Sequence, residues 1–236
     1  MNASMINSAQ TIEERLVQVP AGAVTLEGNL TLPQDSQAVV LFAHGSASSR
    51  HSPRNRYVAR MLNEAKLATL LIDLLTPHEE VIDERTAQLR FDIDLLAERL
   101  VDTTDWLTQY PDTKYLRIGY FGASTGAAAA LVAAAERPDQ VHAIVSRGGR
   151  PDLAGPALPR VRAPTLLIVG GNDVQVIELN RLALAQLRSE KQLVIIPGAT
   201  HLFEEPGALD KVAWLAREWF QRHLIPAAQR AAGNSK

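Results

Sequence analysis

Residues Ile118–Glu136 read IGYFGASTGAAAALVAAAE, and one serine in this stretch, Ser124, stands between Gly122 and Gly126. The apolar residues before the serine predict a buried strand, and the alanine-rich residues after it predict a helix. Bulky side chains two residues before or after Ser124 would collide where strand and helix cross. The stretch therefore predicts a sharp strand-to-helix turn that holds Ser124 in a strained backbone conformation and exposes its hydroxyl.

Further apolar runs and amphipathic segments alternate along the chain. The predicted strands are 38–45, 67–74, 115–122, 141–146, 163–171 and 191–198, and the predicted helices are 55–64, 83–110 with one break, 125–136, 176–189 and 207–223. The strands are continuously apolar, which is typical of a parallel sheet covered on both faces. Residues 15–33 read as an antiparallel hairpin at one edge. The sequence thus predicts the α/β class, with a doubly wound, mostly parallel sheet.

Composition limits the function classes. The 236 residues are 46% hydrophobic and 21% charged, which fits one globular domain over 16–225 with mobile tails at 1–15 and 226–236. A net charge of −2 gives no reason to expect nucleic acid or a membrane surface as a partner. The chain has no cysteine, which excludes disulfides and thiolate chemistry. Without a signal-like or membrane-spanning apolar segment, we expect a cytoplasmic protein, as a monomer or homodimer.

A hydroxyl nucleophile needs a base and an orienting acid. Of the six histidines, His201 follows the last predicted strand, at the same sheet edge as Ser124. Asp173 follows the preceding predicted strand, 163–171, in the stretch LLIVGGNDVQV. Alternatives remain: Ser124 as an incidental residue of a glycine-rich turn, His201 as a surface residue, Asp173 as a helix cap, and Asp152 as the orienting acid. We favour Ser124, Asp173 and His201 as the catalytic residues.

Two backbone N–H groups are candidates for an oxyanion hole. Thr125 begins the helix after the nucleophile, where N–H groups lack intrahelical partners. Ser46 follows His44 and Gly45 in the loop after the first parallel strand. For His44 we favour a structural role in that loop. The serine turn lacks the lysine of a phosphate loop and the third glycine of a dinucleotide fingerprint, and no acidic loop leading into a phosphate-binding turn supports phosphoribosyl transfer.

Four pieces, AHGSASSRHSPRN, GYFGASTGAAAAL, VGGNDVQV and PGATHLF, give the sequence a resemblance to the α/β-hydrolase superfamily, specifically to its small dienelactone hydrolase-like members. The resemblance extends over about residues 38–224. It implies an eight-stranded core and a Ser–His–Asp hydrolase that acts on small esters and needs no metal or cofactor. The segment between Ser146 and Ala163 is too short for a large helical lid.

The resemblance leaves several activities open. Dienelactone hydrolase itself uses a cysteine nucleophile, so Ser124 favours a carboxylesterase over a dienelactone-type hydrolase. A cofactor-free perhydrolase or haloperoxidase would use the same three residues. A non-catalytic binding protein is the remaining alternative, but it would gain nothing from an intact triad.

Basic residues crowd the loops after the predicted strands. Arg50, Arg54 and Arg147 are candidates for binding an anionic group of the substrate. The alternative, which we favour slightly, is a solvated surface or ion pairs with the acidic stretch 79–84.

Overall fold

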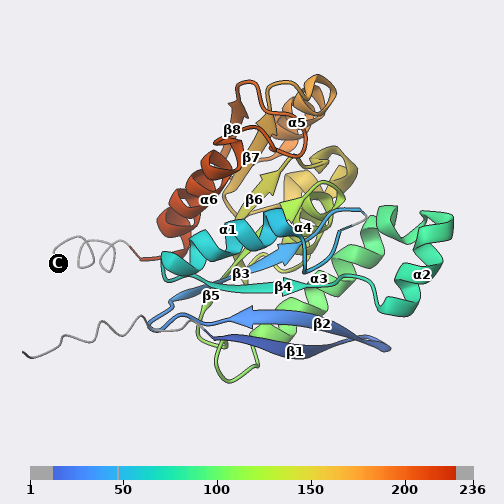
Figure 1. The fold of residues 1–236 in the computed structure, drawn as a ribbon, viewed down its shortest axis with the longest axis vertical. Helices are drawn as coiled ribbons and strands as arrows, with labels where there is room; N and C mark the ends of the chain where they lie inside the picture. The colour runs from blue at the N-terminus through green and yellow to red at the C-terminus, as the bar shows by residue number, and fades with distance from the viewer. Residues whose placement is uncertain (1–12, 47, 227–236) are drawn as a thin grey trace, which may run out of the picture.

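The structure, a computed structural model, describes residues 13–46 and 48–226. Within this part of the chain, one sheet has eight strands in the order β1-β2-β4-β3-β5-β6-β7-β8 (Figure 1). The β1–β2 and β2–β4 pairs are antiparallel, and the other pairs are parallel. The strands are β1 (Glu14–Ala21), β2 (Val24–Thr31), β3 (Ala38–Ala43), β4 (Ala68–Ile72), β5 (Arg117–Ala123), β6 (Val141–Arg147), β7 (Thr165–Gly170) and β8 (Lys191–Ile196).

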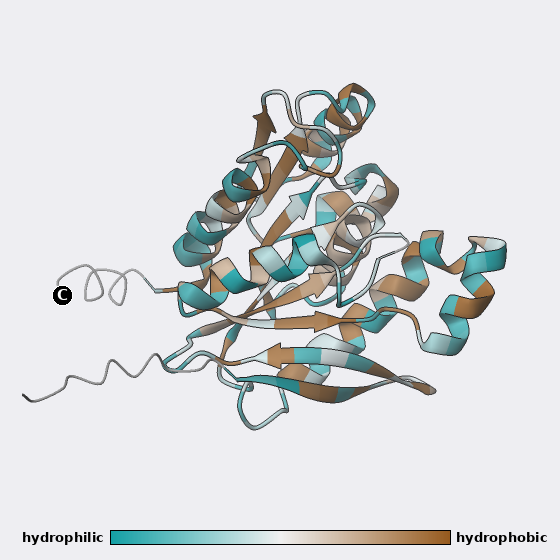
Figure 2. Cartoon of the chain, viewed as in Figure 1, coloured by the Kyte–Doolittle hydropathy of each residue, from teal (hydrophilic) through white to brown (hydrophobic). Residues whose placement is uncertain are grey.

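This architecture confirms the expected doubly wound, mostly parallel sheet. Every strand lies within two residues of its predicted ends. Alternate residues of β3 explain the continuous apolar runs: Val39 and Leu41 pack in one buried cluster, and Val40 and Phe42 pack in another. Both clusters are covered by helices, so neither face of the central strands meets solvent, and these strands are mostly brown, the colour of hydrophobic residues, in Figure 2.

Helices cover the two faces of the sheet. The cluster that contains Val39 packs against α3 and α4, and the cluster that contains Val40 packs against α1 and α6. The helical segments are α1 (Pro53–Glu64), α2 (Pro77–Thr86), the 3₁₀ turn η1 (Leu89–Phe91), α3 (Ile93–Leu107), α4 (Thr125–Glu136), the 3₁₀ segment η2 (Pro151–Arg160), α5 (Val174–Gln186) and α6 (Ala208–Leu224).

The helix predicted over 83–110 is two helices and a 3₁₀ turn. The break falls at Ala87, which has φ 53° and ends α2. Helix α2 begins at Pro77, earlier than predicted, because Thr76 and Glu79 form a reciprocal capping box. His78 lies in the first turn of α2.

Two expectations concern the boundaries of the domain and the size of any lid over the sheet. Strand β1 begins at Glu14, two residues before the predicted domain boundary, and most of both predicted tails lies outside the described residues. The β6–β7 connection contains only η2, so no large lid covers the sheet there. Over residues 13–46 and 48–226, every helix is too short or too polar to cross a bilayer.

The strand order locates the candidate site. From β3 the chain crosses to β4 on one side, and it then returns to β5 on the other side. The loops after β3 and β5 therefore diverge at a topological switch point, where open α/β sheets bind ligands beyond the carboxyl ends of their strands. Ser46 and Ser124 lie in these two loops.

Candidate active site

Ser124 lies at the turn between β5 and α4, with φ 50° and ψ −122°. A positive φ is rare for a residue with a side chain and costs free energy unless surrounding structure enforces it. Three backbone hydrogen bonds hold the turn. The Ser124 N–H donates to Arg147 O (3.4 Å), and Ser124 O accepts from the N–H groups of Ala127 (3.1 Å) and Arg150 (3.0 Å). The sharp turn predicted from the sequence is therefore present, and its strain is typical of a nucleophile elbow.

Gly122 and Gly126 permit the turn by close backbone approach. A Cβ on Gly122 would stand 2.5 Å from Ala127 Cα, where β5 meets α4 as expected. A Cβ on Gly126 would stand 2.3 Å from Ala43 O and 2.4 Å from His44 O. The second glycine thus accommodates the end of β3 rather than β5, a long-range contact that the sequence did not indicate.

His201 and Asp173 meet beyond the ends of β8 and β7. The His201 Nδ1–H donates to Asp173 Oδ2 at 2.6 Å, which leaves Nε2 free to accept a proton. Asp173 stands at the N-cap position of α5, but within the described residues its side chain makes no capping hydrogen bond. Its carboxylate therefore does not act as a helix cap. A Cβ on Gly148, which follows β6, would lie 3.5 Å from His201 Cε1. The imidazole therefore borders the end of β6, the strand beside the Ser124 elbow.

A working triad also needs a hydrogen bond between the Ser124 hydroxyl and His201. Within residues 13–46 and 48–226, no hydrogen bond joins the Ser124 hydroxyl to His201. Catalytic hydrogen bonds are often long in ligand-free structures and shorten when substrate binds. The geometry brings the predicted acid and base together beyond β7 and β8, and the serine stands at the end of β5, with β6 between them.

Asp152, the alternative acid, has a different partner. Its carboxylate accepts two hydrogen bonds from Arg150, at 2.9 Å from Nε and 2.8 Å from Nη2. This two-pronged ion pair lies within the β6–β7 connection. Asp152 therefore does not orient His201.

The two segments proposed for the oxyanion hole are in contact. Ser46 Oγ lies 3.2 Å from Thr125 Oγ1, so the loop after β3 reaches the N-terminus of α4. His44 has the structural role expected for it: Nδ1 bonds to Gly45 O (3.0 Å), and Nε2 accepts from the Leu74 N–H (3.0 Å). Burial lowers the pKa of His44, which keeps the ring neutral.

A cavity of about 300 Å³ adjoins the oxyanion segments. Ser46 and Thr125 line one side, and Glu80 and Glu84 of α2 line another. Burial and the nearby Asp73 raise the pKa of Glu80. The acidic stretch 79–84, expected only as a source of ion-pair partners for arginines, thus also forms part of the cavity wall.

The three candidate substrate-binding arginines do not form one cluster. Arg50 is engaged in ion pairs with Asp73 and with Glu27 (2.6 Å), so its assignment to substrate binding is not supported. Arg54 pairs with Glu204 at 3.3 Å. Arg147 is 8% exposed, and within the described residues its guanidinium pairs with no carboxylate.

Comparisons with known proteins identify the family. A model of the dienelactone hydrolase family matches residues 69–224. The chain belongs to the dienelactone hydrolase family. A dienelactone hydrolase from Anabaena variabilis is 66% identical, with a TM-score of 0.89 over 90% of this chain and 99% of that one. The fold and family expected from the sequence are therefore confirmed.

One further solved structure and one curated relative extend the comparison. An α/β serine hydrolase without a lid from Xanthomonas campestris shares the fold, with a TM-score of 0.71 and 20% identity over 91% of this chain and 97% of that one. A Mycobacterium tuberculosis protein, provisionally named a phosphoribosyl transferase, is 59% identical over 213 residues, which are 90% of this chain and 47% of that protein. The chain thus spans about half the length of the curated relative it matches.

Proposed function

We propose that this chain is a serine hydrolase that cleaves small carboxylic esters through an acyl-enzyme on Ser124. The observation that carries the proposal is the hydrogen-bonded pair of His201 and Asp173 beside a serine with φ 50°. Membership of a hydrolase family supports the same conclusion. A backbone strained at one hydroxyl, with a base and an acid beyond other strand ends at the same edge of the sheet, matches the needs of nucleophilic catalysis.

The residues have distinct roles in this mechanism. His201 Nε2 accepts the Ser124 proton as the serine oxygen forms a bond to the ester carbonyl carbon, and Asp173 stabilises the resulting imidazolium. The Ser46 and Thr125 N–H groups bind the oxyanion. His201 then protonates the departing alcohol, which leaves Ser124 acylated. A water molecule, deprotonated by His201, releases the acid and restores the serine.

Ester hydrolysis explains this chain better than the name of its Mycobacterium tuberculosis relative does. That relative is about twice as long as the matched region, so the portion outside the match can carry a different activity. The turn at Ser124 presents a strained serine and not the lysine of a phosphate loop. Perhydrolase chemistry on the same residues remains a second candidate, because hydrogen peroxide in place of water would yield a peracid from the same acyl-enzyme.

The test compares two serine-to-alanine variants. Ser124→Ala should lower kcat for short p-nitrophenyl esters by about 10⁴- to 10⁶-fold and should abolish rapid labelling by a fluorophosphonate. Ser146→Ala is the matched control, because its hydroxyl is buried on the adjacent strand β6 and has no hydrogen-bond partner. More than a tenth of wild-type activity in a folded Ser124→Ala protein would refute the assignment.

A further inference from the structure

Arg147 is a buried cation without a counterion. It ends β6 and is 8% exposed. Its side chain lies on the α1 face of the sheet, where Nη2 donates to Asn55 Oδ1 at 3.5 Å. Over residues 13–46 and 48–226 no carboxylate pairs with it. Burial and the nearby Arg54 lower its pKa to about 10. Burying an uncompensated charge costs several kcal/mol, so this arrangement calls for an explanation.

Two other arginines of the described residues whose side chains are at most 15% exposed are compensated by carboxylates. Arg99 is equally buried, yet it bonds to Glu79 (3.0 Å) and to Ala21 O (2.8 Å). Arg50 is held by Asp73 and Glu27. Arg147 therefore differs from arginines that serve the fold through ion pairs.

A second cationic group and a helix N-terminus face the same place. Arg54 is the second residue of the twelve-residue helix α1, whose first turn has no acidic residue. Its ion pair with Glu204 is weak because Glu204 is 66% exposed. The start of α1 is itself capped, because Pro53 has no N–H and the Asn55 N–H donates to Ser52 Oγ at 3.4 Å, so the positive charge here comes from the two guanidinium groups.

Arg147 borders the proposed reaction centre. Arg147 O accepts the Ser124 N–H, and the next residue, Gly148, lies against His201. We propose that Arg147 and Arg54, in the first turn of α1, form a subsite that binds an anionic oxygen group, a carboxylate or a phosphate ester, carried by the substrate. As a substrate subsite it rests on the proposed hydrolase function.

The subsite also sets the orientation of the substrate. The cavity beside Ser46 and Thr125 is lined by three carboxylates, Glu80, Asp83 and Glu84, and by one cation, Arg90, which pairs with Asp83. The remaining negative charge repels an anion. The anionic group therefore binds on the α1 side of the nucleophile, and the rest of the substrate enters the cavity on the α2 side. A guanidinium suits the first role because its planar fork pairs with two oxygens at once.

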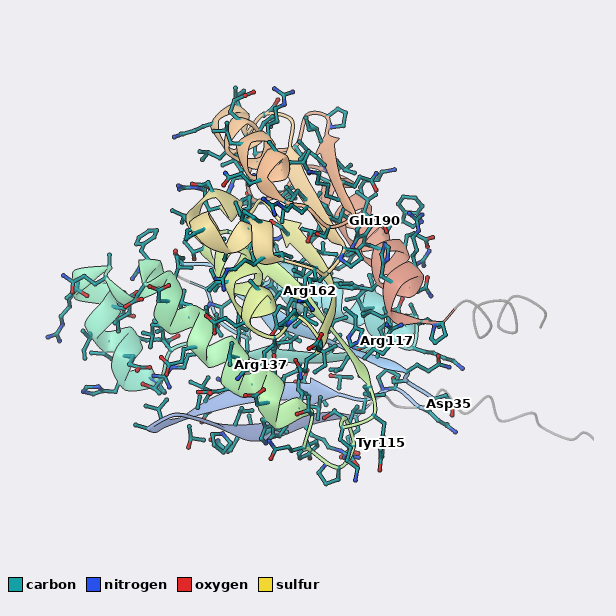
Figure 3. The ribbon with its side chains drawn as sticks, turned by 180° about the vertical axis from the view of Figure 1, so that it is seen from behind. Asp35, Tyr115, Arg117, Arg137, Arg162 and Glu190 are labelled. Atoms are coloured by element: carbon teal, nitrogen blue, oxygen red, sulfur yellow. The ribbon has the colours of Figure 1, made fainter. Side chains whose placement is uncertain are left out.

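A kinetic experiment measures the charge preference. The substrates are the mono-p-nitrophenyl ester of glutaric acid and its neutral methyl diester analogue. The wild type should show a KM about tenfold or more lower for the charged ester, with similar kcat. Arg54→Gln and Arg147→Gln should remove that difference. The control Arg162→Gln removes the same charge at the amino end of β7 (Figure 3), where Arg162 pairs with Asp139, and should retain the difference.

A binding experiment separates this inference from the proposed function. In the Ser124→Ala protein, glutarate or inorganic phosphate should raise Tm above an equal ionic strength of chloride, and Arg54→Gln should abolish the rise. The stronger of the two anions identifies the group. The Arg54 side chain is 32% exposed, so its replacement tests the site even if Arg147 variants do not fold.

The outcomes separate cleanly. Anion binding without any ester hydrolysis would reject the hydrolase and support the subsite. Hydrolysis with equal KM for both esters, together with no rise in Tm, would overturn the subsite and leave the hydrolase. A rise in Tm that survives Arg54→Gln would also overturn it, since the anion would then bind elsewhere.

Discussion

Replacing Ser124 by glycine should make the protein more stable than replacing it by alanine. Ser124 holds φ 50° and ψ −122°, a combination that glycine adopts freely and that alanine adopts only under strain. Relief of this strain stabilises the glycine variant by about 1–3 kcal/mol. The greater conformational freedom of its unfolded chain destabilises it by about 0.4–1 kcal/mol. The free energy of unfolding of Ser124→Gly should therefore exceed that of Ser124→Ala by roughly 0.5–2 kcal/mol.

Urea titration measures this difference. The two variants should have equal m values, and the midpoint should be higher for glycine. In a domain of this size each kcal/mol corresponds to about 2–4 °C in Tm. The same pair of substitutions at Ser146, inside strand β6, is the control, and there glycine should be the less stable variant. If Ser124→Gly is no more stable than Ser124→Ala, the backbone at the elbow is unstrained and the argument from φ is wrong.

We make four further predictions about the candidate site and the residues packed around it. Asp173→Asn should lower kcat by about 10⁴-fold, whereas Asp152→Asn should have a mild effect; the reverse result would move the acid to the loop after β6. Gly126→Ala should cost about 3 kcal/mol or more in chemical denaturation, because its Cβ would meet two backbone oxygens at 2.3 and 2.4 Å; a cost under 1 kcal/mol would contradict the packing. Burial lowers the pKa of His44, so the unfolded chain takes up its proton first and stability should fall as pH drops below about 6.5; a pH profile unchanged in His44→Gln would exclude this cause. Without a large lid, esters with acyl chains of about two to six carbons should react best, and a rate jump on emulsified triglyceride would count against an open site.

The strands were predictable because both faces of the central sheet are buried, which leaves a continuous apolar run in the sequence. The start of α2 was also predictable, since Thr76, Pro77 and Glu79 form a helix-start pattern, although the helix was expected to begin at Asp83. The 3₁₀ segment η2 was not predicted. It contains three prolines and no helical periodicity, so local sequence gives it little signal.

Chain order and strand ends were enough to bring Asp173 and His201 together, because the carboxyl ends of parallel strands share one edge. The arginines could not be sorted in the same way. Arg50 finds Asp73, which is 23 residues away, and Arg54 finds Glu204, which is 150 residues away. Such pairings depend on how loops from distant strands meet, and nothing local in the sequence records them.

Asp173 is placed where a helix would use it, yet its carboxylate serves His201 instead. Helix α5 consequently begins without a side-chain cap, and a cap is worth about 1 kcal/mol. Selection for thermal tolerance alone should therefore accept Asp173→Ser or Asp173→Asn, and Ser124→Gly with them, since each relieves a local cost that the folded chain bears. Variants evolved for heat resistance without an activity screen should accumulate changes at these two positions first, which makes such a screen an independent way to find the residues that the protein keeps for chemistry.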